Sequence, residues 1–474
     1  MKNKNIKKIH FVGIKGVGMT PLAIIAKEAG FIVTGSDVAE PFITDIELTK
    51  SGINPFIGFS KENVRDVDLV IATGAHGGTE NIEVKEAVNS NISVLTQGDA
   101  LGIFQDGEIF GKKYKGICIA GSHGKTTTTA IIATILKENN LNPSYAIGTG
   151  EIPSLGLSGH FGQGKYFVAE ADEYFADVVN NKTPKFLFLN PFIVVITNVD
   201  YDHPDIYESV GEISDALLEF AKKIPPDGVL IVNGDGEENR KFIASFNGRK
   251  ITYGFSPNND YILERVNSSP EKMFFWIKSK ETILGEFSMQ IFGEQNAQNA
   301  LAAIIVGLEI GLPIEKIKKG LSKFKGTKRR SEFIGNLESG GLVYDDYAHH
   351  PKEIKETLSA FKKSFPKFRI ITIFQPHMYS RTKKLFNDFS NSFPDSDEVL
   401  ITEIFPSFRE KKDPDFSSSL LVQEIKKFGK NAIYFPALSD VVKYVTSQKY
   451  GKNTLVITMG AGDIYKVGEK LLDG

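Results

Sequence analysis

Short apolar runs rich in Val and Ile recur along the chain, and most end in a glycine turn or in polar residues. The runs are IHFVGI, FIVTGSD and DLVIATG, then GICIAG, YFVAEADE, FIVVITNVDYDH and GVLIVNGDG, and finally LVYDDY, FRIITIF, EVLITEI and TLVITMG. Helix-length segments separate them. Short β-branched runs that alternate with helices are typical of parallel sheets with crossover helices. The pattern therefore predicts an α/β protein in which this plan occurs three times.

Three such blocks need more than one hydrophobic core, and the chain's 474 residues exceed what a single core usually serves. We place the domains at residues 1–110, 111–323 and 324–474, with the polar segment GKKYKG between the first two. In the second block, KITYGF, MFFWIK and EFSMQIFG predict a small β-rich appendage ahead of the helical stretch NAQNALAAIIVGLEIG.

The strongest local motif is a phosphate-binding loop between the run GICIAG and a helical stretch. Its residues are Gly121, Ser122, His123, Gly124, Lys125, Thr126 and Thr127. Glycines let backbone N–H groups approach phosphate oxygens, and the helix N-terminus adds a positive dipole end. We expect Lys125 to neutralise the β- and γ-phosphates of ATP and Thr126 to ligate Mg²⁺. The alternative is a helix-capping turn with an exposed lysine.

This loop is shorter than the standard motif G-x-x-x-x-G-K-[ST]. Only two residues separate its glycines, and Ile119 stands where the outer glycine belongs. The shortening points to a narrower family than P-loop proteins at large.

A second glycine turn, from Gly13 to Gly18, lies near the start of the chain. Its order is G-x-x-G-x-G, which differs from the dinucleotide fingerprint G-x-G-x-x-G. Asp37 follows Gly18 by 19 positions, about where an acid that binds a ribose belongs. Alone, the turn fits a nucleotide diphosphate and close strand–helix packing equally well. With an ATP loop downstream, a second nucleotide-bearing substrate is the better interpretation.

Polar side chains gather where strands of the second block end. They are Glu170, Asp172 and Glu173 after one run and Asn198, Asp200, Asp202 and His203 after the next. Ligands of open α/β sheets collect outside these strand ends. Mg²⁺ commonly uses one or two protein groups besides phosphates and water. We therefore expect Glu170 and His203 to share a magnesium site with Thr126.

Two groups of residues lie at the entry to the third block. The guanidinium groups of Arg329 and Arg330 suit phosphate oxygens, and a basic linker is the alternative. The segment DDYAHHP runs from Asp345 to Pro351. Its adjacent histidines and acids resemble a metal site, but the proline and the spacing favour a turn that points the rings apart. We expect a substrate or nucleotide contact there rather than zinc.

The formal net charge of −2 gives no general attraction to nucleic acid or to an anionic membrane. Cys118 is the single cysteine, which excludes an internal disulfide and a multi-cysteine zinc site. The apolar stretch at the N-terminus is too short for a signal peptide, and no run approaches the ~18 residues that span a bilayer. We expect a cytoplasmic monomer or weak dimer that neither inserts into membranes nor binds nucleic acid.

Eight stretches of the chain resemble, in the same order, the Mur ligases of peptidoglycan synthesis. They are HFVGIKGVGM, AGSHGKTTTT, AEADE, ITNVDYDHPD, FKGTKRR, YDDYAHHPKE, FQPHMYSRT and TMGAGDI. The resemblance implies an ATP- and Mg²⁺-dependent ligase that activates a carboxylate as an acyl phosphate and couples it to an amine. It also implies a Rossmann-like N-terminal domain for a UDP-sugar, a central P-loop ATPase-like domain, and a Rossmann-like C-terminal domain that admits an amino acid.

The resemblance further implies roles for individual residues. The implied catalytic residues are Lys125, Glu170, His203, Arg329 and Arg330. The implied ATP-binding residues are those of the phosphate loop with Asn296, Asn299, Arg330 and Asp346. The implied metal ligands are Thr126, Glu170 and His203. The implied substrate-binding residues are Gly16, Val17, Gly18, Met19, Asp37 and His76 for the UDP-sugar, and Tyr347, His349, His377 and Arg381 around the amino acid.

Two substrate sets remain open within the family. FQPH and TMGAGDI favour joining L-alanine to UDP-N-acetylmuramate, whereas Ala348 and the long segment DVVNNKTPKF are more like a recycling ligase that attaches a murein tripeptide. We favour L-alanine, whose amine would lose a proton to His203 or His349. The chain departs from the alanine-adding pattern at Lys15, Gln295, Ser331 and Met378, and Met378 stands where the motif FQPHRYSRT has an arginine.

Other classes of protein fit single motifs only. A dinucleotide-dependent oxidoreductase would use the first glycine turn, but the spacing of this turn and the second nucleotide loop count against it. A regulator that binds ATP without ligation would need a further module, and no DNA-reading module or basic helix is present. Folylpolyglutamate-type ligases share the ATP domain but lack the first block.

Overall fold

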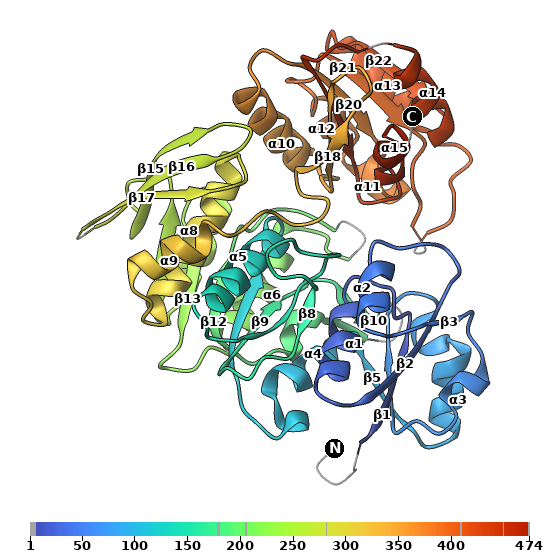
Figure 1. The fold of residues 1–474 in the computed structure, drawn as a ribbon, viewed down its shortest axis with the longest axis vertical. Coiled ribbons are helices and arrows are strands. Elements are labelled where there is room, and N and C mark those ends of the chain that lie inside the picture. Colours follow the sequence, from blue (N-terminus) through green and yellow to red (C-terminus); the bar gives the residue numbers. More distant parts are fainter. Residues whose placement is uncertain are drawn as a thin grey trace.

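The computed structural model describes residues 6–177, 181–203, 206–280, 282–407, 410–448 and 450–472. Residues 178–180 of the segment DVVNNKTPKF and residues 204–205 of ITNVDYDHPD lie outside the described residues. The chain forms three α/β domains, which confirms the predicted fold class. The first domain (blue) and the central domain (cyan to yellow) lie side by side, and the third (orange to red) lies across one end of both (Figure 1).

The first domain is a parallel sheet with the strand order β3-β2-β1-β4-β5. Its strands are β1 (Lys8–Val12), β2 (Ile32–Asp37), β3 (Phe56–Ile57), β4 (Leu69–Ala72) and β5 (Ser93–Thr96). Its helices are α1 (Thr20–Glu28), α2 (Asp45–Lys50), α3 (Ile82–Asn89) and α4 (Gln97–Asp106), with 3₁₀ turns η1 (Lys61–Val64), η2 (Gly78–Glu80) and η3 (Glu108–Phe110). The runs IHFVGI, FIVTGSD and DLVIATG predict β1, β2 and β4, whereas no predicted run covers β3, which has two residues, or β5, which contains only two apolar residues.

The central domain contains a ten-stranded sheet with the order β17-β16-β15-β14-β13-β12-β6-β9-β7-β8. Its parallel part consists of β6 (Lys115–Ala120), β7 (Ser144–Ala146), β9 (Tyr166–Glu170), β12 (Pro191–Ile196), β13 (Val229–Asn233) and β14 (Lys250–Gly254), and β8 (Gly159–His160) pairs antiparallel at one edge. The helices are α5 (Lys125–Glu138), α6 (Val210–Ala221), α7 (Glu237–Ser245), α8 (Glu294–Glu309) and α9 (Ile314–Leu321). A separate hairpin of β10 (Phe175–Asp177) and β11 (Asn181–Pro184) leads into η4 (Lys185–Phe188).

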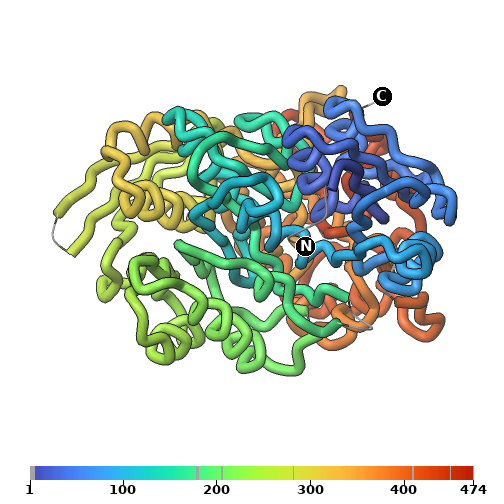
Figure 2. Tube along the Cα trace, turned by 90° about the horizontal axis from the view of Figure 1, so that it is seen from below, coloured from blue at the N-terminus to red at the C-terminus, as the bar shows by residue number. Residues whose placement is uncertain are grey.

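The predicted β-rich appendage is part of this sheet and not a separate unit. Strand β15 (Tyr261–Ser268) pairs parallel with β14, and β16 (Met273–Ser279) and β17 (Ile283–Met289) continue the sheet antiparallel. Figure 2 shows these strands at the end of the central domain that is far from the first domain.

The third domain has the strand order β18-β19-β23-β20-β21-β22, and only β18 is antiparallel to its neighbour among the described strands. The strands are β18 (Glu332–Asn336), β19 (Leu342–Asp346), β20 (Arg369–Phe374), β21 (Glu398–Thr402), β22 (Ala432–Phe435) and β23 (Thr454–Met459). The helices are α10 (Pro351–Ser364), α11 (Tyr379–Lys384), α12 (Phe386–Ser390), α13 (Ser418–Lys427), α14 (Leu438–Ser447) and α15 (Tyr465–Lys470).

Alternate residues of the buried strands face opposite sides of each sheet, as the two-residue period of a strand requires. In β6, Ile117 and Ile119 join the core beneath α5 and α8, whereas Cys118 and Ala120 join a second core. This second core continues without a break into the first domain, where it includes Phe11. The first and central domains thus share one apolar core.

The third domain is attached by less apolar surface. Its sheet carries its own apolar clusters on its two faces. Phe292 of the central domain packs into one of them, against Tyr344, Phe361 and Phe365. Polar contacts also join this domain to the rest, among them those at the site described below. Within the described residues, every helix is too short or too polar to cross a bilayer.

Glu47 of α2 is a buried acid at the boundary between the first and central domains. Its two carboxylate oxygens accept hydrogen bonds from the backbone N–H and the hydroxyl of Ser158, and the side chain is fully buried. Burial raises the pKa of this carboxyl from 4.5 to about 7, although the Ser158 bonds and Lys50 oppose the rise and Glu151 adds to it. Glu47 therefore keeps its proton up to about pH 7 in the folded protein.

We predict that Glu47→Gln removes a pH-dependent loss of stability. Between pH 4.5 and 7 the folded chain binds a proton that the unfolded chain releases, so the free energy of unfolding falls as the pH rises. The fall is on the order of 3 kcal/mol. Glutamine keeps the contacts to Ser158 without titrating, so the variant should match the wild type at pH 5 and melt at a higher temperature at pH 8.

The exposed residue Glu108 provides the control for this prediction. Melting curves of Glu108→Gln at the two pH values should follow those of the wild type. If Glu47→Gln melts below the wild type at pH 8, the buried carboxyl is ionised and stabilising, contrary to this account.

Candidate active site

The phosphate loop follows β6, which lies between β9 and β12 in the sheet. From β6 the chain continues to β7 on one side, and after β9 it crosses β6 to reach β12 on the other, so the connections change direction at this strand. This switch point is where open α/β sheets bind ligands. Gly121 and Gly124 have φ of +119° and +81°. A Cβ atom at Gly121 would lie 2.4 Å from Thr197 Oγ1, and one at Gly124 would lie 2.5 Å from Asn299 Oδ1. Glycine is therefore required at both positions.

The loop presents unpaired backbone donors at the start of α5. Within the described residues, the N–H groups of Gly124, Lys125 and Thr126 donate to no acceptor. A helix of this length also has a positive dipole end at its N-terminus. Together these groups form the kind of anion site that binds a nucleotide phosphate.

Lys125 is buried at this loop, and its ammonium contacts three acceptors. The Nζ atom lies 2.7 Å from Gly121 O, 3.1 Å from Ser122 O and 2.8 Å from Glu173 Oε2. Burial by itself would lower the pKa of Lys125, but the charges of Glu173 and Glu170 outweigh it and raise this pKa. The side chain is therefore a fixed cation beside the free N–H groups.

Thr126 and Glu170 lie together beside this lysine. Thr126 Oγ1 donates to Glu170 Oε1 over 2.9 Å, and the backbone N–H of Gly148 donates to Glu170 Oε2 over 2.9 Å. Burial raises the pKa of the Glu170 carboxyl, and Lys125 only partly offsets this effect. A bound divalent cation would favour the ionised carboxylate, so a hydroxyl and a carboxylate here fit the oxygen donors that Mg²⁺ uses.

His203 is oriented by groups from two domains. Its Nε2 atom lies 2.9 Å from Glu173 Oε1, and its Nδ1 atom lies 3.2 Å from Arg381 Nη2. A guanidinium can only donate, so Nδ1 accepts and Nε2 carries the proton in the neutral ring. Among the described residues, no group of three or more His, Cys, Asp or Glu side chains is arranged to hold a metal by itself. Any metal here would need ligands from a substrate or water.

Arg381, at the start of the third domain's α11, joins that domain to the central one. Its Nη2 atom lies 3.1 Å from Asp202 Oδ1, and both side chains are 3% exposed. Burial would raise the pKa of Asp202, but His203, Arg381 and His349 hold it well below its usual range. Arg381 Nη1 also lies 3.4 Å from His377 Nδ1. An ionised carboxylate and a guanidinium thus hold the two domains together in the site.

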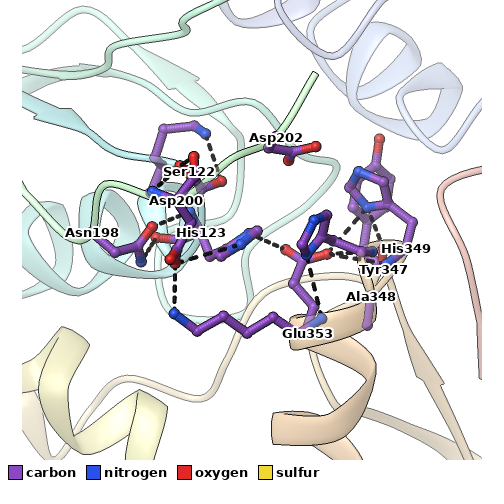
Figure 3. A network of polar contacts seen from close by, with 12 residues as sticks. Ser122, His123, Asn198, Asp200, Asp202, Tyr347, Ala348, His349 and Glu353 are labelled. Carbon is purple, nitrogen blue, oxygen red and sulfur yellow. Dashed lines mark hydrogen bonds and ion pairs between the residues drawn. The ribbon is translucent and has the colours of Figure 1, made fainter. Parts of the chain in front are cut away.

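Glu353 of α10 is a second link between these domains (Figure 3), and it is not among the residues predicted from the sequence. Its Oε1 atom lies 3.1 Å from His123 Nδ1 in the phosphate loop, and its Oε2 atom accepts from the backbone N–H groups of His349 and His350. Burial would raise its pKa, but His349, His123 and Arg330 hold it well below its usual range. The only available signal was its capping position, three residues into a helix, in YDDYAHHPKE.

Seven of the eleven residues predicted to bind the nucleotide line a cavity of about 280 Å³ between the central and third domains, and Gly121, Ser122, Lys125 and Thr126 do not. Of the predicted set, His123, Gly124, Thr127, Asn296, Asn299, Arg330 and Asp346 lie on its wall. Asp346 accepts from the backbone N–H groups of Ser331 and Ala348, and burial raises its pKa to about 6 although Arg330 and these bonds oppose the rise.

The two linker arginines have different surroundings. Arg329 Nε lies 3.0 Å from Asp345 Oδ2, and its Nη atoms donate to the backbone carbonyls of Gly460 and Gly462. These contacts fix it to the third domain. Both guanidinium groups lie over the Tyr347 ring, at 5.1 Å for Arg329 and 4.9 Å for Arg330, but Arg330 lines both this cavity and the next.

A second cavity, of about 370 Å³ and called the large cavity below because it exceeds the first, is lined by all three domains. Of the predicted site residues, it is lined by Gly16, Val17, Gly18, Met19, Ser122, His123, Gly124, Lys125, Thr126, Glu170, His203, Arg329, Arg330, Tyr347, His349, His377 and Arg381. The first glycine turn therefore faces the phosphate loop across one cavity, as the interpretation of two nucleotide-bearing substrates requires.

Asp37 and His76 do not line this cavity. The Asp37 carboxylate accepts from the backbone N–H groups of Lys15 and Val38, and its Oδ1 atom lies 3.4 Å from His76 Nε2. The pair therefore contacts the backbone of the glycine turn rather than the cavity. A direct contact of Asp37 or His76 with the substrate stays a prediction.

The adjacent histidines of the third domain point in different directions, as the sequence suggested. His350 caps α10 and accepts from the N–H of Lys352, whereas His349 lines the large cavity and its Nδ1 atom lies 3.0 Å from Tyr347 O. Burial lowers the pKa of His349 to about 3, although Glu353 opposes the change. Its ring is neutral at physiological pH and a weak base.

Three family models match consecutive parts of the chain. The model described as Mur ligase family, catalytic domain, matches residues 8–107, the Mur ligase middle domain matches residues 119–307, and the Mur ligase, glutamate ligase domain matches residues 329–462. The matches follow the order of the three sheets and cover most of the chain.

Individual proteins match over nearly the full length. A UDP-N-acetylmuramate–L-alanine ligase of Desulfitobacterium hafniense is 41% identical over 98% of this chain and 99% of its own. The crystal structure of a UDP-N-acetylmuramate-alanine ligase from Thermotoga maritima superposes with a TM-score of 0.81 at 28% identity, over 98% of each chain. A murein peptide ligase from Psychrobacter arcticus gives a TM-score of 0.69 at 23% identity, again over 98% of each chain. The last of these identities shows a shared fold alone.

Proposed function

Because this chain belongs to the Mur ligase family, we propose that it joins L-alanine to the lactyl carboxylate of UDP-N-acetylmuramate at the expense of ATP. It is an ATP-dependent ligase that forms an amide bond. The observation that carries the proposal is the large cavity, which brings together a sugar-nucleotide turn, a phosphate loop and a basic wall of the third domain. An amide ligase that uses ATP needs these three features within reach of one another.

L-Alanine is better supported than the tripeptide as the incoming amine. The relatives that are 37% to 41% identical over nearly the whole chain are named as alanine ligases. The murein peptide ligase shares the fold at lower identity. The features that resemble the recycling ligase, Ala348 and the segment DVVNNKTPKF, do not outweigh agreement over the full length.

The first step transfers the γ-phosphoryl group of ATP to the lactyl carboxylate. Phosphoryl transfer is catalysed mainly by positioning and by neutralising charge. The free N–H groups from Gly124 to Thr126 and the ammonium of Lys125 would bind the phosphates, and Arg330 would approach from the linker. Thr126, Glu170 and His203 would hold Mg²⁺, which supplies positive charge to the phosphate oxygens.

The second step couples the acyl phosphate to the amine, with phosphate as the leaving group. Tyr347, His349, His377 and Arg381 would surround the amino acid. The lowered pKa of His349 argues against its accepting the proton of the amine at neutral pH. His203 is the other candidate, but it can accept this proton only while it does not ligate Mg²⁺. Because acyl phosphates hydrolyse, the contacts of Arg381 and Glu353 with the central domain would also keep water out.

Further proposals assign the substrates to domains and to individual residues. We propose the domain limits 1–110, 111–323 and 324–474 for the sugar nucleotide, ATP and the amino acid, with Asn296 and Asn299 near the adenine. Arg329, whose donors are bound within the third domain, would position Arg330 rather than touch phosphate. Both nucleotide substrates favour a cytoplasmic location, and we expect a monomer or weak dimer.

Product mass provides the test of this function. Purified protein with Mg²⁺-ATP and UDP-N-acetylmuramate should release phosphate only when the amine is added, and the product should gain the mass of one alanyl residue. Supplied with the tripeptide instead, it should give little product. A preference for the tripeptide would favour the recycling activity, and no ATP cleavage with either amine would exclude a ligase.

A further inference from the structure

Lys185, the first residue of η4, is a cation in the large cavity to which no step above assigns a role. Its side chain is 17% exposed, and its Nζ atom lies 2.7 Å from Asp172 Oδ2. Asp172 is itself oriented, because its Oδ1 atom accepts from the backbone N–H of Tyr174. The ammonium therefore has a fixed direction and keeps donors for a further partner.

This lysine lies against the start of α4 in the first domain, although it belongs to the central domain. A Cβ atom at Gly98 would lie 3.4 Å from the Cα and Cβ atoms of Lys185. The preceding residue, Gln97, donates from Nε2 to Gly18 O over 3.2 Å. The start of α4 thus lies between the turn and Lys185, and all three line the same cavity.

The turn has free donors of its own but no free cation. Within the described residues, the backbone N–H groups of Val17 and Gly18 donate to no acceptor. The ammonium of Lys15 is directed away, since Nζ donates to Glu40 O over 3.0 Å and lies 3.4 Å from Asp45 Oδ1. Its side chain is 6% exposed and does not line the cavity. An anion on this turn would need its counter-charge from another domain.

The other lysines and arginines on the cavity wall have partners or roles elsewhere in the site. Lys125 belongs to the phosphate loop, Arg381 is bound to Asp202, and Lys328 Nζ lies 2.6 Å from Glu332 Oε1. Arg330 lies beside the ATP cavity. A sugar nucleotide carries a diphosphate, and a lysine ammonium is a suitable point charge for phosphate oxygens.

We propose that Lys185 binds the diphosphate of the sugar nucleotide, opposite the N–H groups of Val17 and Gly18, with Asp172 as the residue that positions it. The site for this substrate is then completed by the central domain, and the first domain alone would bind it weakly. The inference rests on the proposed function, because it takes the ligand of the first glycine turn to be a UDP-sugar.

Binding to the full-length protein tests this assignment. Titration calorimetry would compare UDP-N-acetylmuramate, UDP-N-acetylglucosamine, which has the diphosphate but no lactyl carboxylate, and uridine, which has neither. Lys185→Met should weaken binding of both UDP-sugars by about 10- to 100-fold, since a hydrogen bond to a charged group contributes about 1.5–3 kcal/mol. Uridine binding should not change, and Lys185→Arg should restore much of the loss.

Lys182→Met is the matched control, because this lysine lies on β11, the adjacent strand, and is exposed. It should bind all three ligands as the wild type does. Unchanged affinity of Lys185→Met for UDP-N-acetylglucosamine would overturn the proposal, and a loss confined to UDP-N-acetylmuramate would assign the ammonium to the carboxylate. A wild type without ligase activity would instead contradict the proposed function, whatever the variants do.

Discussion

Replacing Lys125 by methionine is expected to lower the turnover number about 1000-fold or more while binding of UDP-N-acetylmuramate persists. The Lys125 ammonium is the one buried cation of the phosphate loop, next to the free N–H groups at the start of α5. Stabilisation of developing charge by such a preorganised group is commonly worth 3 kcal/mol or more in the transition state, and about 4 kcal/mol corresponds to 1000-fold. The measurement is release of phosphate that depends on the amine.

Two further variants separate this effect from loss of structure. Lys125→Arg keeps a cation beside Glu173, so it should fold as the wild type does and still react slowly, because the larger guanidinium displaces the phosphate. Lys137→Met removes a lysine from the other end of the same helix, where the side chain is exposed, and should retain full activity. Near-normal turnover of Lys125→Met would show that the loop does not bind the reacting phosphates.

Much of the central site is predictable because its determinants are local in sequence. The phosphate loop needs a strand, two glycines, a lysine and a helix in succession, and a motif of seven residues specifies all of them. The acids at the ends of β9 and β12 follow from the same logic, since neighbouring parallel strands end at one edge of the sheet. These acids lie near the phosphate loop because β6 lies between β9 and β12 in the sheet.

Contacts between distant parts of the chain are not predictable in this way. Arg381 meets His203 across 178 positions, and His123 meets Glu353 across 230 positions. No periodicity or spacing encodes such pairs, which exist because three domains converge on one cavity. The roles of Glu353 and Lys185 were missed for this reason, since each gains meaning only from a residue of another domain.

The number of strands that join the central sheet is also not predictable from the sequence. The segments KITYGF, MFFWIK and EFSMQIFG read as strands, but pairing is a property of the fold. Only the parallel pairing of β14 with β15 shows that the appendage extends the main sheet. Strand β15 itself, YILERVNS, lacks the apolar run that marks the other strands, because most of its residues are only half-buried or exposed.

Replacing Arg381 by methionine is expected to lower the turnover number by at least about 100-fold and to raise the Michaelis constant for L-alanine. The guanidinium bonds Asp202 and His203 of the central domain from a position that is 3% exposed. Removing one partner of a buried charged pair leaves the other unpaired, at a cost of about 2–5 kcal/mol. The motif FQPHMYSRT contains no second arginine, so no neighbouring guanidinium in the motif can substitute.

The reaction step that each variant loses distinguishes the role of Arg381 from the role of Lys125. Arg381 belongs to the third domain, so Arg381→Met should still bind ATP and UDP-N-acetylmuramate with ordinary affinity, because their sites rest mainly on the other two domains. Its acyl phosphate, trapped with hydroxylamine, should form and then be lost to water rather than to the amine. Lys384→Met, on the same helix but exposed, should couple normally. A contrary result would be a loss of nucleotide affinity in Arg381→Met with an unchanged Michaelis constant for L-alanine. The guanidinium would then serve the first step, and its bond to Asp202 would not hold the third domain over the reacting groups.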